Sequence, residues 1–422
     1  VIGGWTLSDN AILTYGVNQG VFIPLEDYFE KYCPNISAIL DLPGVREKMT
    51  APDGHIYTIP YVCGDTTVGY SPYINTKWLE NVGMSMPTTT DEFEAVLKAF
   101  KEQDANGNGD ASDEIPFSTD PNNKHIEAMA GYFGLPMNKL GIAIQDEKVV
   151  YGGVSNTYRE FLSWFHKLYA DGLVDVELYT QDSSTWEGKG NQDLYGVSIA
   201  YGSNEFTGIP AAEERGDFDS MPVLNTDKGG IWLRDTEGFS VYRTQAVITN
   251  KAEHPEIICR WFDNAFALEN GIGCNRGPVG VIVNKEDDGY HAIDTTTLSE
   301  EDQEKYSWGN LWPQSLPKYL PADFEFVEEH PMYDEKKATE EAYEANLTKE
   351  IIPSYWIDLD KIDTFSDTNT AIKDFFEQQQ AQFVCGELDI DNDADWQAYV
   401  DGMYSLGLED WVATQGIEEI AK

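Results

Sequence analysis

The sequence has few basic residues, and this scarcity excludes several kinds of partner. Lys and Arg total 28 against 74 Asp and Glu, which gives a formal net charge of −46. A surface with this charge repels phosphate backbones and anionic lipids, so we do not expect nucleic-acid binding. A polyanionic ligand would need a local basic pocket. The sequence also has no run of about 18 apolar residues, so no segment is expected to span a bilayer.

Cysteine is scarce and scattered. The cysteines are Cys33, Cys63, Cys259, Cys274 and Cys385. No two of them form a CxxC pair, and none has the spacing to histidine that zinc sites show, so a zinc site is not expected. Because the number is odd, at least one thiol stays free within a monomer. At most two disulfides could form, and we expect none.

Catalytic motifs are also missing. The sequence has no G-x-S-x-G elbow, no HExxH pair and no Walker loop. Its six histidines are scattered, with no pair at helical metal spacing. Two carboxylates could serve a glycosidase, but among 74 acidic residues chance proximity is certain. The sequence therefore gives no positive sign of an enzyme.

The opening residues, Val1–Leu7, have no basic stretch and no initiator Met, so they do not read as a signal peptide. They are typical of a strand that enters a glycine turn. We expect the sequence to begin inside a domain, with part of the protein, including any targeting signal, upstream of it.

The length of 422 residues suits two lobes, at roughly 100–200 residues each, and 41% hydrophobic residues are enough for globular cores. Segments with strand patterns alternate with helical ones, which predicts α/β lobes. The strands are expected near 56–60, 66–75, 194–201 and 239–249. The helices are expected near 26–31, 76–82, 87–103, 157–171, 254–262, 335–347, 367–384 and 393–406.

The most specific motif is the loop from Asp104 to Glu114. Oxygen-bearing side chains recur at its first, third and fifth positions, with glycines between them. Calcium takes six to eight oxygen ligands, and glycines let the backbone wrap around the ion. An EF-hand loop has Glu at its twelfth position, where this loop has Ile115. The pattern predicts a structural Ca²⁺ site, and its alternative is a solvated acidic turn.

Several stretches together resemble one family, the extracellular solute-binding proteins of ABC importers. The resemblance is closest to the large oligosaccharide-binding lipoproteins of Gram-positive bacteria and to alginate-type binding proteins. The stretches that carry it are Val68–Gly83, Pro87–Phe93, the loop Asp104–Pro116, Ile248–Phe262 and Phe383–Leu408. The loop matches the family's "DxNGNGxxDEIP" pattern, with one additional residue before Asp113.

The resemblance implies a calcium-ligand set. Asp104, Asn106 and Asn108 would give side chains, Asp110 a backbone carbonyl, and Asp113 and Glu114 carboxylates. Because of the additional residue, Ser112 and Asp113 compete for the later position.

The resemblance also implies a two-lobe fold of the periplasmic-binding-protein type II, each lobe a mixed sheet flanked by helices. Lobe 1 would comprise residues 1–66 and 243–317, with its opening strand and helix upstream of this sequence. Lobe 2 would comprise residues 71–239 and 318–422. The hinge would lie near 66–70, 239–243 and 317. Such a protein would close on a ligand between its lobes and deliver it to a membrane permease. It would be a monomer outside the cell, held to the membrane by a lipidated N-terminus upstream of this sequence.

The aromatic content of 13% suits a carbohydrate ligand. Sugars stack their C–H faces on aromatic rings, and their hydroxyls need polar side chains. For any single residue, packing is the commoner role. The ligand-binding candidates are Trp5, Tyr61 and Asp65 in lobe 1, and Trp186, Tyr201, Asn204, Trp232 and Arg234 in lobe 2, with Trp308 and Trp312 at the rim. Trp232 and Arg234 would face one way on a strand, with an ordinary ion pair as the alternative.

The function expected from these observations is non-catalytic binding of an oligosaccharide. A carbohydrate-active enzyme, such as a glycosidase or lyase, is the alternative from another class. A binding protein for a peptide or another solute is a third alternative.

Overall fold

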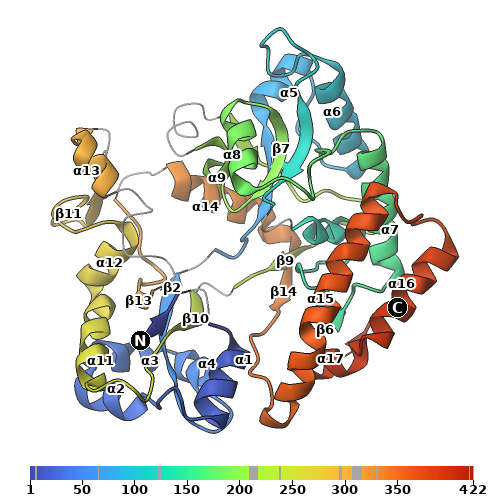
Figure 1. Cartoon of the computed structure of the whole chain (residues 1–422). Coiled ribbons are helices and arrows are strands. Elements are labelled where there is room, and N and C mark those ends of the chain that lie inside the picture. The colour runs from blue at the N-terminus through green and yellow to red at the C-terminus, as the bar shows by residue number, and fades with distance from the viewer. Residues whose placement is uncertain are drawn as a thin grey trace. The chain divides into compact units, whose positions relative to one another are not determined.

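In the computed structural model the chain divides into two compact units, each built from three segments of sequence (Figure 1). Unit 1 comprises Val1–Thr66, Thr236–His330 and Pro353–Ser366, and unit 2 comprises Thr67–Asp235, Pro331–Ile352 and Asp367–Lys422. The structure describes residues 1–4, 7–64, 66–121, 125–208, 217–236, 239–293, 297–306, 316–327, 331–417 and 419–421, with backbone alone for 331–334.

The chain passes from unit 1 to unit 2 between Thr66 and Thr67 and returns between Asp235 and Thr236. We expected a third crossing near Pro317, but the chain stays in unit 1 there. The reason is that β13 (Lys318–Tyr319) pairs in parallel with β2 (Thr58–Gly64) of unit 1. The next crossing follows His330, and residues 353–366 also belong to unit 1. Residues 236–239, 318–330 and 353–366 are therefore corrected from lobe 2 to unit 1.

Unit 1 is built on a mixed four-stranded sheet in the order β1-β10-β2-β13. Strand β10 (Phe239–Val247) runs antiparallel both to β1 (Ile2–Gly3) and to β2. Its register on β2 shifts between Tyr242 and Ala246, which marks a bulge. A two-stranded hairpin is formed by β11 (Val283–Lys285) and β12 (Tyr290–Ala292).

The helices of unit 1 are short, and several of them pack apolar side chains on this sheet. They are α1 (Asp9–Ile12), η1 (Leu13–Asn18), α2 (Glu26–Tyr32), α3 (Pro34–Leu40), α4 (Val45–Met49), α11 (Pro255–Asp263), η3 (Asn264–Phe266), α12 (Leu268–Arg276), α13 (Glu300–Lys305) and η7 (Leu359–Lys361). Phe29, Ile36 and Phe262 from three of these helices meet Ile59 and Val62 of β2 in one buried cluster. The first and second sequence segments of unit 1 thus share a core.

Unit 2 also has a mixed four-stranded sheet, in the order β4-β7-β3-β8. Strand β7 (Tyr195–Ala200) lies parallel to β4 (Ile115–Thr119) and antiparallel to β3 (Ser71–Asn75), whose other neighbour is the antiparallel β8 (Phe218–Ser220). Smaller sheets join β5 (Ile142–Gln145), β6 (Lys148–Tyr151) and β15 (Glu419–Ile420), and join β9 (Trp232–Arg234) to β14 (Leu347–Ile351).

The helices of unit 2 include several whose ends the sequence predicts. Helix α6 (Thr90–Glu102) is capped by Thr89, whose hydroxyl accepts a hydrogen bond from the Glu92 backbone at 3.2 Å. Helix α7 (Asn156–Ala170) stops before Gly172, which has a positive φ of 68°. The others are α5 (Thr76–Val82), η2 (Ile126–Phe133), α8 (Ser183–Asn191), α9 (Asn204–Thr207), α14 (Pro331–Tyr343), η6 (Glu344–Asn346), α16 (Asp393–Ser405) and α17 (Leu408–Thr414).

Two details near the C-terminal third differ from the expected pattern. The helix expected over 335–347 ends at Tyr343, because Leu347 begins β14 and pairs in parallel with Trp232. Helix α15 (Ile362–Cys385) begins five residues before the expected Asp367. Its later part lies beside α7 in Figure 1, where Gln380 donates to the Tyr158 hydroxyl at 2.9 Å. None of the helices in the described part of the chain is long and apolar enough to cross a bilayer.

Candidate functional site

Three aromatic rings lie together in unit 2. Tyr70 directly precedes β3 and Tyr201 directly follows β7, and the register pairs Ser71 with Ala200, so both tyrosines stand at the same end of the sheet. The ring of Tyr70 stacks on His125 with 4.0 Å between centroids and meets Tyr201 edge-on at 6.1 Å. Tyr201 is 37% exposed. We call these three residues the unit 2 aromatic patch.

A buried lysine fastens this patch. Lys336 of α14 donates to the carbonyl of Gly69 at 2.6 Å and to the carbonyl of Tyr201, and its ammonium lies 4.3 Å from the Tyr201 ring centroid. One side chain therefore ties the residues before β3 to those after β7. Burial lowers the pKa of Lys336 to about 8, while Glu335 and Glu205 oppose that shift.

Acidic side chains surround the same patch. Glu335 accepts hydrogen bonds from the Ser203 backbone at 2.9 Å and its hydroxyl at 2.7 Å. Glu205 accepts from the Tyr201 backbone at 2.9 Å. Burial raises the pKa of both Glu335 and Glu205, with these hydrogen bonds acting against it. The patch thus combines ring faces with hydrogen-bond acceptors of negative charge.

His125 has an unusual conformation for this position. Its φ of 49° lies in the left-handed region, which costs a non-glycine residue conformational energy. Its Nε2 is buried with no hydrogen-bond partner among the described residues. Burial lowers the pKa of His125 to about 3, so the imidazole is neutral near pH 7. It offers the patch a neutral ring and a nitrogen able to take one more hydrogen bond.

Unit 1 has an aromatic pair of its own. Tyr61 of β2 and Tyr242 of β10 are cross-strand partners, and their rings stack with centroids 5.5 Å apart. The Tyr61 hydroxyl donates to Asn275 at 2.8 Å. The ammonium of Lys318 lies 4.7 Å from the Tyr61 ring centroid, and burial lowers the pKa of Lys318 to about 8. Only part of the Tyr61 surface is exposed.

Three of the expected ligand residues, Trp186, Trp232 and Arg234, are engaged in contacts within unit 2. Trp186 is 3% exposed, packs on Phe206 and donates its indole N–H to Ser198 at 3.1 Å. Trp232 is 2% exposed. Since a buried ring offers no face to a sugar, both are corrected to core residues. Arg234 donates to the Thr348 carbonyl at 3.1 Å and pairs with Glu344 at 3.2 Å. This is the ordinary ion pair that the sequence offered as the alternative to ligand binding for Arg234.

The remaining expected ligand residues fall into two groups. Tyr201 lies in the unit 2 aromatic patch, Asn204 begins α9 three residues later, and Tyr61 belongs to the unit 1 pair. The others lie outside the described residues: Trp5, Asp65, Trp308 and Trp312.

Sequence reasoning missed Tyr70, His125, Tyr242 and the lysines Lys318 and Lys336. Tyr70 and Tyr242 could have been found from the strands next to them, because β3 and β10 were both expected. The left-handed backbone of His125 and the burial of the lysines have no local sequence signal.

The loop after α6 is held by its own side chains. Asn106 Oδ1 accepts from the Asn108 backbone at 3.0 Å, and Asn108 Oδ1 accepts from the Asp110 backbone at 2.8 Å. The amides of the same two asparagines donate to Asp113 at 3.2 and 2.8 Å. Asp110 accepts from both the hydroxyl and the backbone of Ser112. Of the two residues that compete for the later ligand position, Asp113 accepts hydrogen bonds from the two asparagines, and Ser112 donates to Asp110.

Two carboxylates of this loop fit a bound cation. Asp104 Oδ1 and Glu114 Oε2 are buried and have no hydrogen-bond partner among the described residues. Their other oxygens accept from the backbones of Gly109 and Ala105, both at 2.9 Å. Burial raises the pKa of Glu114, and Asp113 adds to that shift. Unpartnered buried carboxylate oxygens are costly, and a hard divalent cation would satisfy them.

A second group of potential metal ligands lies in the turn between β11 and β12. Ligand atoms of Glu286, Asp288 and His291 lie within 4.8 Å of one another. Both carboxylates are exposed, and His291 Nε2 lies 2.9 Å from Asp288. This contact lowers the pKa of Asp288 and accounts for the arrangement as a surface ion pair.

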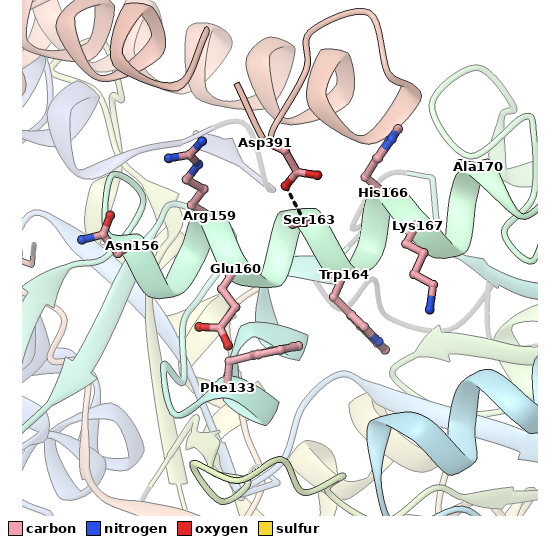
Figure 2. Close-up of a pocket in the computed structure, with 10 residues that line it drawn as sticks. All are labelled: Phe133, Asn156, Arg159, Glu160, Ser163, Trp164, His166, Lys167, Ala170 and Asp391. Carbon is pink, nitrogen blue, oxygen red and sulfur yellow. Dashed lines mark hydrogen bonds between the residues drawn. The ribbon is translucent and has the colours of Figure 1, made fainter. Parts of the chain in front are cut away.

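A groove of about 730 Å³ runs along the outer face of α7 (Figure 2). It contains none of the expected ligand residues. Arg159 and Ser163 point toward the segment that holds Asp391, to which Ser163 donates at 2.9 Å, and Arg159 donates to the Ile390 carbonyl. Lys167 is paired with Glu94. Because these polar groups are already engaged, the groove marks a seam between α7 and the C-terminal segment.

Comparison with known proteins identifies relatives. No protein-family model matches the chain. Over 273 residues it is 34% identical to the fructooligosaccharide ABC transporter substrate-binding protein FusA of Streptococcus pneumoniae, covering 62% of this chain and 50% of FusA. Over 218 residues it is 30% identical to the lipoprotein LipO of Bacillus subtilis, covering 50% of this chain and 40% of LipO. The matches thus span half or less of the curated relatives.

Solved structures match over nearly the whole chain. FusA in complex with kestose superposes with a TM-score of 0.84 at 26% identity, over 98% of this chain and 86% of that one. A FusA EF-hand mutant in complex with fructo-nystose gives a TM-score of 0.82 at the same identity and coverage. The alginate-binding protein AlgQ2 gives 0.75 at 22% identity, over 96% and 83%, and shows the fold alone. The expected fold class is confirmed.

Replacing Trp186 by Phe tests its reassignment to the core. The change removes the indole donor and leaves the buried Ser198 hydroxyl without that partner. We expect a loss of about 1–3 kcal/mol in the free energy of unfolding, measured by urea denaturation. An unchanged urea midpoint would contradict a core role for Trp186.

The pKa of His125 predicts a pH dependence of stability. Because its pKa is lower in the folded state than its ordinary 6.5, protons favour the unfolded chain. The contribution of His125 to the free energy of unfolding is fully present above pH 6.5. It is lost as the pH falls toward 3, by at most about 1.4 kcal/mol per pH unit.

The substitution His125→Asn, which tolerates the left-handed conformation, should make the acid-side loss of stability shallower than in the wild type. The matched control is His254→Asn, because the His254 side chain is 67% exposed. Thermal unfolding followed from pH 7 to pH 4 measures the difference. Identical slopes for the wild type and both variants would refute the assignment.

Proposed function

We propose that this chain, a homologue of the substrate-binding proteins of ABC importers that shares their fold, binds a neutral oligosaccharide and delivers it to a membrane permease. The observation that carries the proposal is the unit 2 aromatic patch of Tyr70, His125 and Tyr201. The proposed location is the outer face of the cell membrane, where a lipid anchor would keep the protein, as a monomer, near its permease.

The patch has the chemistry that sugars need. A sugar ring stacks on aromatic faces through its C–H groups, and Tyr201 offers an exposed ring. Sugar hydroxyls need hydrogen-bond partners, and Asn204, Glu205 and the unpartnered Nε2 of His125 lie in or next to the patch. The anchoring by Lys336 supports a preformed site, since both tyrosines are fixed before a ligand arrives.

The charges around the patch favour a neutral ligand. Lys336 is the cation at its centre, but it is buried and committed to backbone carbonyls. Four acidic residues act on this lysine: Glu335, Glu205, Glu340 and Asp235. An acidic sugar would meet net repulsion at this place. FusA, whose name gives fructooligosaccharide as its substrate, is consistent with this preference.

Hinge closure is part of the same proposal. A ligand that binds one state of the protein better than another shifts the population toward that state by the difference in its binding free energy. Small-angle X-ray scattering with and without the oligosaccharide would measure the compaction expected from closure.

The proposed function is binding without turnover. Incubation with candidate oligosaccharides, followed by chromatography of the sugars, should return them intact. Cleavage products would favour the carbohydrate-active enzyme. Calorimetric binding of short peptides with no binding of neutral sugars would favour the transport of another solute.

We also propose a structural Ca²⁺ in the loop Asp104–Glu114. The residues that would hold it are Asp104, Asn106, Asn108, Asp110 through its carbonyl, Asp113 and Glu114. Support comes from the buried unpartnered oxygens of Asp104 and Glu114, and from the relative FusA, one form of which is named an EF-hand mutant. The ion would neutralise these carboxylates and fix the connection between α6 and β4.

The binding proposal predicts a role for the exposed ring of Tyr201. In calorimetry with kestose as the probe, Tyr201→Ala should weaken binding at least tenfold, about 1.4 kcal/mol, because a stacking face is lost. The matched control is Tyr404→Ala on α16, since Tyr404 is 42% exposed and lies in the same unit. Equal affinities for the wild type and Tyr201→Ala would reject the patch as the site.

The calcium proposal predicts a metal-dependent melting temperature. Ca²⁺ at a hundred times its dissociation constant should stabilise the wild type by about 2.7 kcal/mol, and a chelator should remove this gain. Asp104→Asn and Glu114→Gln should abolish the response, whereas Asp41→Asn, at a 71% exposed site in unit 1, should keep it. A calcium response that survives both loop substitutions would place the ion elsewhere.

A further inference from the structure

Two buried cysteines of unit 1 come from distant parts of the sequence. Cys33 stands between α2 and α3, in the first segment of the unit, and Cys259 lies on α11, in the second segment. Both side chains are 0% exposed and belong to the same apolar cluster as Phe29 and Phe262. The Cys259 side chain is the main cause of the raised pKa of the Cys33 thiol, which is consistent with the two side chains lying near each other in this cluster.

A pair of hydrogen bonds beside the two cysteines also holds α11 against α3. Asp263, one helical turn after Cys259, accepts from the Ile36 backbone at 2.8 Å and from the Asn35 amide at 2.9 Å. It therefore caps the first turn of α3 from outside that helix. Residues four apart lie on one face of a helix, so the face of α11 that presents Asp263 to Ile36 also presents Cys259 to Cys33.

Both thiols are free in the structure, and the sequence alone predicts no disulfide. From their shared cluster and the contact of α11 with α3, we propose that Cys33 and Cys259 form a disulfide when the chain folds in an oxidising environment. The bond would join the first segment of unit 1 to its second segment, between which the whole first segment of unit 2 is inserted. Cross-links that close long loops restrict the unfolded chain most, so this pair suits a discontinuous unit.

The chemistry is thiol–disulfide exchange with a small-molecule or protein disulfide as the oxidant. One cysteine thiolate attacks the oxidant's S–S bond, forms a mixed disulfide and releases one thiol of the oxidant. The second cysteine thiolate then attacks the mixed disulfide and releases the other thiol. The protein loses two electrons and two protons, and the oxidant is reduced to two thiols.

Burial determines when this reaction takes place. Contact with Cys259 and desolvation both raise the pKa of the Cys33 thiol, so the folded protein holds it protonated and unreactive. An oxidant reaches the pair before the core closes around it. Once formed, the bond is shielded from reductants by the same core.

The experiment refolds the full chain from denaturant in a redox buffer of an oxidised and a reduced small dithiol. Free thiols are then alkylated in denaturant and the peptides are mapped by mass spectrometry. We expect alkylated thiols to fall from five to three, with one cross-linked peptide pair that contains Cys33 and Cys259. Five alkylated thiols, or a cross-link between other cysteines such as Cys63 and Cys274, would overturn the proposal.

Variants separate this pair from non-specific oxidation. Cys33→Ala and Cys259→Ala should each abolish the cross-link, whereas Cys385→Ser, at an exposed position, should leave it intact. The oxidised wild type should also unfold at a higher urea concentration than the reduced protein, and Cys33→Ala should show no such redox dependence. The peptide map of the wild type decides the question even if the buried variants fail to fold.

Discussion

Unit 1 depends on the antiparallel pairing of β2 with β10. These strands belong to sequence segments on either side of the first part of unit 2, so their pairing is what makes the separated segments one unit. The same register sets Tyr61 opposite Tyr242 and creates the aromatic pair of this unit. Asp263 of α11 caps α3, so the helices of the first and second segments are joined in the same way. Long-range pairing of this kind costs loop entropy, which the shared apolar core must offset.

In unit 2 a single buried cation has a comparable role. Burying an ammonium group is costly unless each of its three donors is paired, and Lys336 donates to the carbonyls of Gly69 and Tyr201 and to the Tyr73 hydroxyl. Its hydrogen bonds to these carbonyls hold two strand ends and the rings beside them in place. The acidic residues nearby raise the pKa of this lysine and so favour its charged form.

The sequence predicted features that depend on neighbouring residues. The Thr89 cap of α6 and the Gly172 stop of α7 act within a few residues, and both helices lie close to the ranges expected for them, 87–103 and 157–171. The helix expected through Leu347 was wrong at its end, because pairing with Trp232 outweighed local helical preference. For the same reason Trp186 was misassigned. Its indole is buried by β7 and α9, and neither contact is visible in the local sequence.

By itself the sequence determined the α/β class, the acidic surface, most helices and the oxygen-rich loop, because composition, periodicity and capping act locally. Only the tertiary structure decided which rings meet. Tyr70, His125 and Tyr201 come from three separate segments, and their contact follows from the register of β3 on β7 and from the left-handed backbone of His125. The tertiary structure also decided which of the scattered cysteines share a buried cluster, namely Cys33 and Cys259. The physical reason is that proximity across long sequence separations is set by strand register and core packing.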